Sequence, residues 1–272
     1  PIRVGPHFAR RVSASATAVY SMPRAGLHVR GDPAQASRLV HTSNIYEIEH
    51  QEALGERLAA ISGMDEVFFC NSGCEANEAA IKLARLYGHQ KGVETPAIIV
   101  MENAFHGRTL ATLSATGNRK AQAGFEPLVT GFIRVPLNDI ASVRQIAATN
   151  RNVVAVLLEP IQGEGGDNHF RPEFLRLLRQ LADENDVLLI FDEVQSGMGM
   201  TGKRWACEHY GVVPDLISFG KKSQVCGVMA GPRLDEVKDN VFRLPSRISS
   251  TFGGNFTDFV RATHYLRIYE QE

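Results

Sequence analysis

The sequence has few cysteines, almost no net charge and no long apolar run, and each absence excludes a class of protein. The 272 residues include four cysteines, scattered and without a C-x-x-C pair. We expect them to be reduced core residues in a reducing compartment, the cytoplasm, with no disulfide framework and no zinc site. A net charge of −1 gives no electrostatic reason to expect nucleic acid or an anionic membrane as a partner. No apolar run is long enough to span a bilayer.

Acidic residues are absent from the first 31 positions. Five arginines lie there, with serine and alanine between them: Arg3, Arg10, Arg11, Arg24 and Arg30. This composition resembles an organellar transit peptide, which would place the protein in the mitochondrial matrix. A poorly ordered basic arm is the plainer interpretation. We favour it and assign residues 1–40 to an N-terminal arm.

After the arm, apolar patterns of helical and strand type alternate. Strands separated by helices are typical of a mostly parallel sheet that helices cover on both faces. We therefore expect one α/β domain over residues 41–272, with a helical crossover between its two strands at 187–191 and 215–220. Helices are predicted at 49–62, 72–87, 140–148 and 172–183, and the other strands at 67–69, 97–101, 153–158 and 227–230.

Two of these strands lead into charged residues that packing does not require. The run at 187–191 ends in Asp192, and the run at 215–220 ends in Lys221, 29 positions later. Ligands of open parallel sheets bind beyond the carboxyl ends of the strands. A carboxylate and an amine are therefore expected at one edge of the sheet.

A phosphate site is predicted where a strand turns into a helix at residues 71–75. Ser72 and Glu75 have capping-box spacing, so a well-capped helix would by itself explain the pattern. The alternative is an anion site, formed by the N–H groups of Gly73 and Cys74 with the Ser72 hydroxyl. The carboxylate and amine at the same sheet edge favour the anion site.

One cofactor, pyridoxal phosphate, needs an acid, an amine and a phosphate site together. Lys221 would form a Schiff base with its aldehyde, and Asp192 would keep its pyridine nitrogen protonated. A competing interpretation takes the acidic strand LLIFDE as part of a P-loop NTPase. That class needs G-x-x-x-x-G-K-[ST], but Lys222 follows Gly220-Lys221 and Arg204 follows Gly202-Lys203, so it is excluded.

Two further loops follow predicted strands. In the loop at 103–108, Phe105 could stack on a planar ring or belong to the core. His106 is more simply explained as a structural histidine, and Arg108 could bind a substrate carboxylate or be a solvated charge. The loop at 159–166 is rich in glycine and holds two acids, but it lacks the helix-opening register of a dinucleotide site. It suits a substrate-facing loop.

Six motifs in this order resemble the class III, fold-type-I pyridoxal-phosphate aminotransferases, the omega-aminotransferase group. The resemblance runs from about His41 to the end of the chain. The motifs are NSGCEANE at 71–78, FHGR at 105–108, EPIQGEG at 159–165, FDEVQ at 191–195, DLISFGK at 215–221 and STFGGN at 250–255.

The resemblance implies a role for each residue near the cofactor. Lys221, rather than Lys222, would be the Schiff-base lysine, and Asp192 would pair with the pyridinium nitrogen. Val194 and Phe105 would lie against the two ring faces. The remaining cofactor contacts would come from Gln195 at the ring oxygen and from Ser72, Gly73 and Cys74 at the phosphate.

The resemblance also implies a substrate site and a partner. Arg108, Glu164 and Gln195 would face the substrate. Thr251 would reach the phosphate bound by the neighbouring subunit, which implies a homodimer with shared active sites. The small C-terminal domain of the family has no counterpart before the chain stops at Glu272.

The activity implied is transfer of the terminal amino group of a basic amino acid to 2-oxoglutarate, giving a semialdehyde and glutamate. Residues 41–164 are most similar to acetylornithine aminotransferase, and residues from 166 onward to lysine 6-aminotransferase. The donor is thus N-acetylornithine, ornithine or lysine. The alternative is a truncated, catalytically impaired homologue that dimerises or binds the cofactor without turnover.

Overall fold

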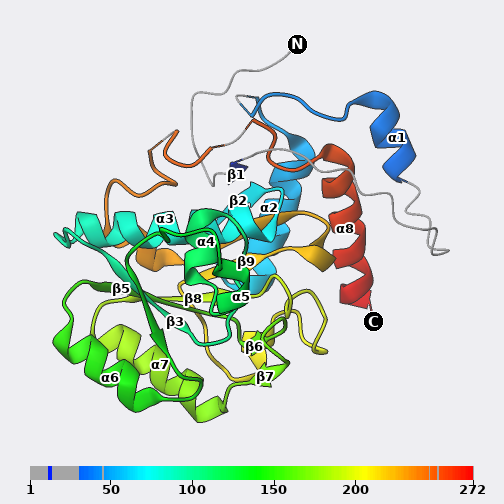
Figure 1. The fold of residues 1–272 in the computed structure, drawn as a ribbon. Coiled ribbons are helices and arrows are strands. Elements are labelled where there is room, and N and C mark those ends of the chain that lie inside the picture. Colours follow the sequence, from blue (N-terminus) through cyan, green and yellow to red (C-terminus); the bar gives the residue numbers. More distant parts are fainter. Residues whose placement is uncertain (1–11, 14–30, 45, 245, 250, 272) are drawn as a thin grey trace.

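An eight-stranded sheet organises the protein, in the order β1-β2-β10-β9-β8-β5-β3-β4 (Figure 1). The computed structural model describes residues 12–13, 31–44, 46–244, 246–249 and 251–271. Neighbouring strands run parallel, except that β10 is antiparallel to both β2 and β9. The predicted mostly parallel α/β sheet is confirmed. The strands are β1 (Val12–Ser13), β2 (Glu66–Cys70), β3 (Ala97–Met101), β4 (Phe132–Val135), β5 (Val153–Leu158), β8 (Leu188–Asp192), β9 (Leu216–Phe219) and β10 (Cys226–Ala230).

Helices cover both faces of the sheet, as Figure 1 shows. One face carries α2 (Glu49–Ser62), α6 (Ile140–Thr149), α7 (Pro172–Glu184) and α8 (Phe256–Gln271), and the other carries α3 (Gly73–Gln90) and α4 (Leu110–Ala115). Local sequence sets their ends. Pro172 opens α7, where its missing N–H costs no hydrogen bond. Gly63 ends α2 with a φ of 72°, and its N–H donates to the Ala59 carbonyl at 3.0 Å.

The core is divided in two by the alternation of side chains along each strand. In β8, Leu188 and Ile190 belong to the core under α3, while Leu189 and Phe191 belong to the core on the opposite face. All four are fully buried, which explains why the sequence shows a continuous apolar run there. The same alternation directs Asp192 toward the α3 side.

The connection from β8 to β9 differs from the sequence prediction. No α-helix lies between them in the described chain: the connection consists of turns and one short 3-10 helix, η1 (Ala206–His209). The predicted helical crossover is therefore wrong. Met198, Gly199 and Gly202 adopt positive φ, which is incompatible with a right-handed helix and which glycine adopts without steric cost.

The predicted arm is only partly within the described residues. Residues 1–11 and 14–30, with all five arginines, lie outside them. Helix α1 (Gly31–Arg38) contacts α8 (Figure 1), and the Phe256 N–H donates to the Val40 carbonyl at 3.3 Å. Among the described helices, none combines the length and apolar character that crossing a membrane requires.

Candidate active site

The carboxyl ends of β8 and β9 bring the predicted acid and amine together. Asp192 ends β8 and pairs in register with Ser218 of β9, three residues before Lys221. The N–H of Glu193 donates to the Ser218 carbonyl at 2.8 Å, which holds the two strand ends side by side.

Val194 connects this pair to the start of α3. A Cβ placed on Gly73 would lie 2.6 Å from Val194 Cγ1, and one placed on Gly220 would lie 3.4 Å from the same atom. Val194 therefore lies between the turn that opens α3 and the turn that carries Lys221. Three motifs that are far apart in the sequence meet around this one side chain.

Asp192 is buried and accepts three hydrogen bonds. Asn77 Nδ2 donates to its Oδ2 at 2.7 Å, and His106 Nδ1 lies 2.9 Å from the same oxygen. The N–H of Val194 donates to Oδ1 at 3.1 Å. A carboxylate has about four acceptor positions, so one remains for a further donor such as a ring N–H.

Polar atoms without partners gather around this carboxylate. In the described part of the chain, Asn77 Oδ1, His106 Nε2 and Ser218 Oγ are buried and make no hydrogen bond. Buried polar groups are rarely left unpaired in a folded protein. The surroundings of Asp192 therefore suit a polar ligand.

The turn that opens α3 presents free backbone donors. No group among the described residues accepts from the N–H groups of Gly73 and Cys74, the first two of an 18-residue helix. The predicted capping box forms only in part. Ser72 Oγ accepts from the Glu75 N–H at 3.1 Å, but the Glu75 carboxylate accepts from the N–H and side-chain amide of Asn71. The free donors at the positive end of the helix suit a phosphate.

The Cys74 thiol links this turn to the loop after β3. Its Sγ accepts from the N–H groups of Arg108 and Thr109 at 3.0 and 3.3 Å. Burial alone would raise the pKa of Cys74, but these bonds and those from the Thr109 and Thr112 hydroxyls outweigh it, so the pKa lies below its usual value. The thiol thus fixes the position of the loop that carries Phe105.

Glu159, at the end of β5, holds the same loop from the other side. Its Oε1 accepts from the Phe105 N–H at 2.9 Å, and its Oε2 accepts from the Gly163 N–H at 3.3 Å. Burial raises the pKa of Glu159 to about 7; His106 opposes this shift and Asp192 adds to it. Glu159 therefore belongs to one buried electrostatic group with His106 and Asp192.

The predicted substrate contacts are not assembled in the same way. Arg108 and Glu164 are exposed, and the Arg108 guanidinium lies 5.5 Å from the centroid of the Phe105 ring. Thr251 is also exposed. Its loop is held against α2 by a hydrogen bond of 3.2 Å from Gln51 Nε2 to the Gly253 carbonyl.

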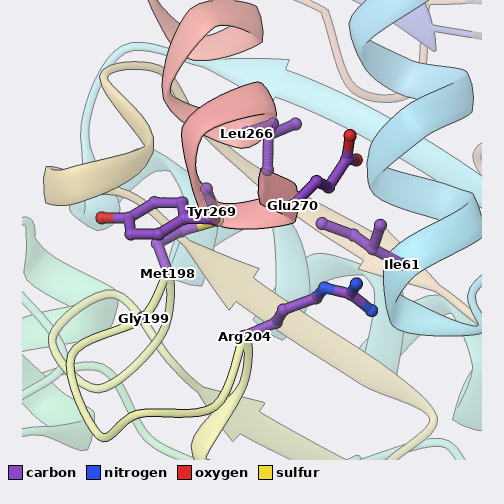
Figure 2. A pocket seen from close by; sticks show the side chains of 7 residues that line it. All are labelled: Ile61, Met198, Gly199, Arg204, Leu266, Tyr269 and Glu270. Carbon is purple, nitrogen blue, oxygen red and sulfur yellow. The ribbon is translucent and has the colours of Figure 1, made fainter. Parts of the chain in front are cut away.

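Two cavities lie away from this site. Figure 2 shows a small one between the end of α2, the turn at 198–204 and the last turn of α8. At about 10 Å³, it holds about one water molecule. The other, of about 320 Å³, is lined by Lys91, Val153 and Val187 among others. It lies at the amino edge of the sheet, where β5 and β8 begin, opposite Asp192.

Sequence reasoning missed three side chains that shape the site. Asn77 could have been noticed, because it is a polar residue on the alanine-rich buried face of α3. The sequence predicts Glu159 only as part of a substrate-facing loop, and Lys222 only as the alternative to Lys221. The structural role expected of His106 agrees with its contact to Asp192.

The strand order, with its antiparallel β10, and the position of Lys221 just after β9, beside Asp192 at the end of β8, are those of the fold-type-I pyridoxal-phosphate transferases. Residues 32–272 match the class III aminotransferase family. The chain belongs to this family, as its motifs predicted, and these enzymes depend on pyridoxal phosphate.

Relatives and solved structures agree with this assignment. Acetylornithine aminotransferase from Nitrosomonas europaea is 54% identical over 238 residues, which cover 88% of this chain and 60% of that protein. Lysine aminotransferase from M. tuberculosis, in the internal aldimine form, is 37% identical with a TM-score of 0.78, covering 89% of this chain and 62% of that one. Ornithine aminotransferase from Toxoplasma gondii is 30% identical with a TM-score of 0.83, covering 89% and 58%. The chain thus spans about 60% of the length of the proteins it matches.

Proposed function

We propose that this chain carries the cofactor site of an aminotransferase that moves the terminal amino group of a basic amino acid to 2-oxoglutarate. The observation that carries the proposal is the buried Asp192 carboxylate, with one acceptor position open, at the sheet edge that also bears Lys221. The products would be a semialdehyde and glutamate.

Pyridoxal phosphate, when bound, supplies an electron sink for the carbon that loses its proton. Asp192 would accept from the pyridine N–H and keep that nitrogen charged. Val194 and Phe105 would lie against the two faces of the ring, and Gln195 would contact the ring oxygen. The N–H groups of Gly73 and Cys74, with the Ser72 hydroxyl, would bind the phosphate.

Lys221 is the residue to which we assign proton transfer. Its backbone has a φ of 54°, and its side chain is exposed at the sheet edge. Its amine would first hold the cofactor and then, once released by the donor, move a proton at the substrate carbon as a general base and acid.

The donor is N-acetylornithine, ornithine or lysine in this proposal, because relatives and neighbours that act on all three types match the chain. Arg108, Glu164 and Gln195 would face the substrate. Thr251 would complete the phosphate site of a second copy, which makes a homodimer part of the proposal. Residues 41–272 would form the cofactor-binding domain after an arm at 1–40.

A cytoplasmic location is the remaining part of the proposal, supported by four free thiols. The alternative, an impaired homologue without turnover, is not favoured, because all the cofactor motifs are present in order.

The test is cofactor binding followed by a glutamate-forming assay. The chain incubated with pyridoxal phosphate is expected to show the visible absorbance of lysine-bound cofactor, and Lys221→Ala is expected to lose it. Glutamate formation from 2-oxoglutarate is then measured with each of the three donors. Retention of the band and of turnover by Lys221→Ala would contradict the assignment. Cofactor binding without turnover on any donor would favour the impaired homologue.

A further inference from the structure

The second lysine of the Lys221-Lys222 pair makes a defined contact of its own. Lys222 Nζ donates to the backbone carbonyl of Gln195 at 2.6 Å, and the side chain is half-buried. Burial lowers the pKa of Lys222, and the neighbouring charge of Lys221 lowers it further. Nothing in the proposed chemistry requires this ammonium group, and holding it there has an electrostatic cost.

This contact is a side-chain link between two turns that follow paired strands. Asp192 ends β8, Val194 and Gln195 lie on the turn after it, and the two lysines lie on the turn after β9. The turn after β8 is already tied to η1, because the buried Glu193 carboxylate accepts from the N–H groups of Ala206 and Cys207, each at 2.8 Å. The Lys222 bond ties the same turn to the turn after β9.

The Gln195 side chain leaves little room for the turn to shift. A Cβ placed on Gly163 would lie 3.0 Å from Gln195 Cγ, so the side chain packs closely on the loop after β5. A small movement of the Gln195 backbone would therefore move its amide away from the place where the cofactor ring oxygen is expected.

We propose that Lys222 is a positioning residue, which holds the turn bearing Val194 and Gln195 in register with the turn bearing Lys221. The effect on the cofactor rests on the proposed function, but the effect on the turn does not. The contact also separates the roles of the two lysines: Lys222 is engaged by a carbonyl and Lys221 is left to react.

The first experiment is hydrogen exchange on the cofactor-free chain, so it does not depend on the proposed function. Lys222→Met keeps the aliphatic stem and removes the donor. The amides of Val194 and Gly197, which donate to Asp192 Oδ1 and the Glu193 carbonyl, are expected to exchange about tenfold faster in this variant. Lys222→Arg is expected to restore most of the protection.

The matched control is Lys203→Met, which removes an exposed lysine from the loop that follows the same turn. It is expected to exchange like the wild type. Wild-type protection in Lys222→Met would overturn the proposal. An equal defect in the methionine and arginine variants would also overturn it, because the donated hydrogen bond would then not be the cause.

The second experiment measures pyridoxal phosphate binding. Lys222→Met is expected to raise the dissociation constant about tenfold and to shift the pH midpoint of the bound cofactor's visible band. In a Gln195→Ala background the same change is expected to add little, because Lys222 would act on the cofactor through the position of the Gln195 side-chain amide, which this background lacks. Full additivity would overturn the coupling to Gln195. Failure of the wild-type chain to bind cofactor would refute the proposed function and leave the exchange result standing.

Discussion

His106 and Asp192 form an enclosed pair, with Nδ1 2.9 Å from Oδ2 and side-chain exposures of 0% and 5%. Because the carboxylate can only accept, the proton between them belongs to the imidazole Nδ1. The pair holds the carboxylate in place at the sheet edge that also bears Lys221. It acts together with Asn77, which donates to the same oxygen.

Asp192→Ala is expected to fold and to lose most of its function. The variant lacks the acceptor for the pyridine N–H, a charge-assisted hydrogen bond that contributes roughly 1.5–3 kcal/mol. We expect cofactor affinity and turnover to fall by about 10- to 100-fold or more, while the circular dichroism spectrum is retained. Unchanged turnover in a folded variant would remove the electron-sink argument.

Asn77→Ala is expected to destabilise the fold itself. Asn77 is buried, and its Nδ2 donates to the His106 carbonyl at 2.8 Å as well as to Asp192. Removal leaves two buried acceptors short of a donor, so we expect a loss of about 2–3 kcal/mol in the free energy of unfolding, measured by urea titration. Gln180→Ala on the surface of α7 is the control, with a change within about 0.5 kcal/mol. Equal effects in the two variants would contradict the burial argument.

Gly73→Ala is expected to displace Val194. The new Cβ would lie 2.6 Å from Val194 Cγ1, closer than real contacts allow, so Val194 would have to move. We expect roughly 1–3 kcal/mol of destabilisation from this overpacking and weaker binding of pyridoxal phosphate. The double variant with Val194→Ala is expected to recover stability relative to Gly73→Ala alone. Thermal unfolding is measured for Gly73→Ala, Val194→Ala and the double variant. If the two single effects on stability simply add in the double variant, the contact between these residues is not the cause.

Glu159 is expected to make stability depend on pH. Burial raises its pKa to about 7 in the folded chain, so the folded state holds the proton more tightly than the unfolded state. Its stabilising contribution is complete below about pH 4.5 and is lost as the pH rises through about 7. Glu159→Gln lacks this titration. We compare the free energies of unfolding as variant minus wild type. This difference is expected to rise by roughly 3 kcal/mol between about pH 4.5 and about pH 7 and then to level off.

The measurement is urea unfolding at half-unit steps from pH 4 to 8.5. A difference that stays flat, or falls with increasing pH, would show that Glu159 is not protonated preferentially in the folded state.

The sequence was sufficient for the features that depend on local patterns. Strands β3 and β5 were predicted with the bounds observed, and the acid and amine were placed at one sheet edge, because apolar runs and the parallel-sheet rule are short-range or topological. Contacts such as that from Asn77 to Asp192 could not be predicted, because 115 positions separate the two residues and only the packing of α3 on β8 decides which atoms meet. The predicted helix between β8 and β9 is wrong for a local reason: the glycines at 199 and 202 adopt positive φ, which outweighs the strand–helix–strand spacing of the sequence.

The antiparallel strand β10 affects how the candidate active site assembles during folding. β10 lies between β2 and β9, with Cys226 opposite Cys70 and Gly227 opposite Phe219. In the described sheet, β2 reaches β9 only through β10, although α3 also packs on β9. The phosphate turn and the lysine turn are therefore joined through the sheet only once residues 226–230 are in place. We expect a chain that lacks this strand to bind pyridoxal phosphate more weakly.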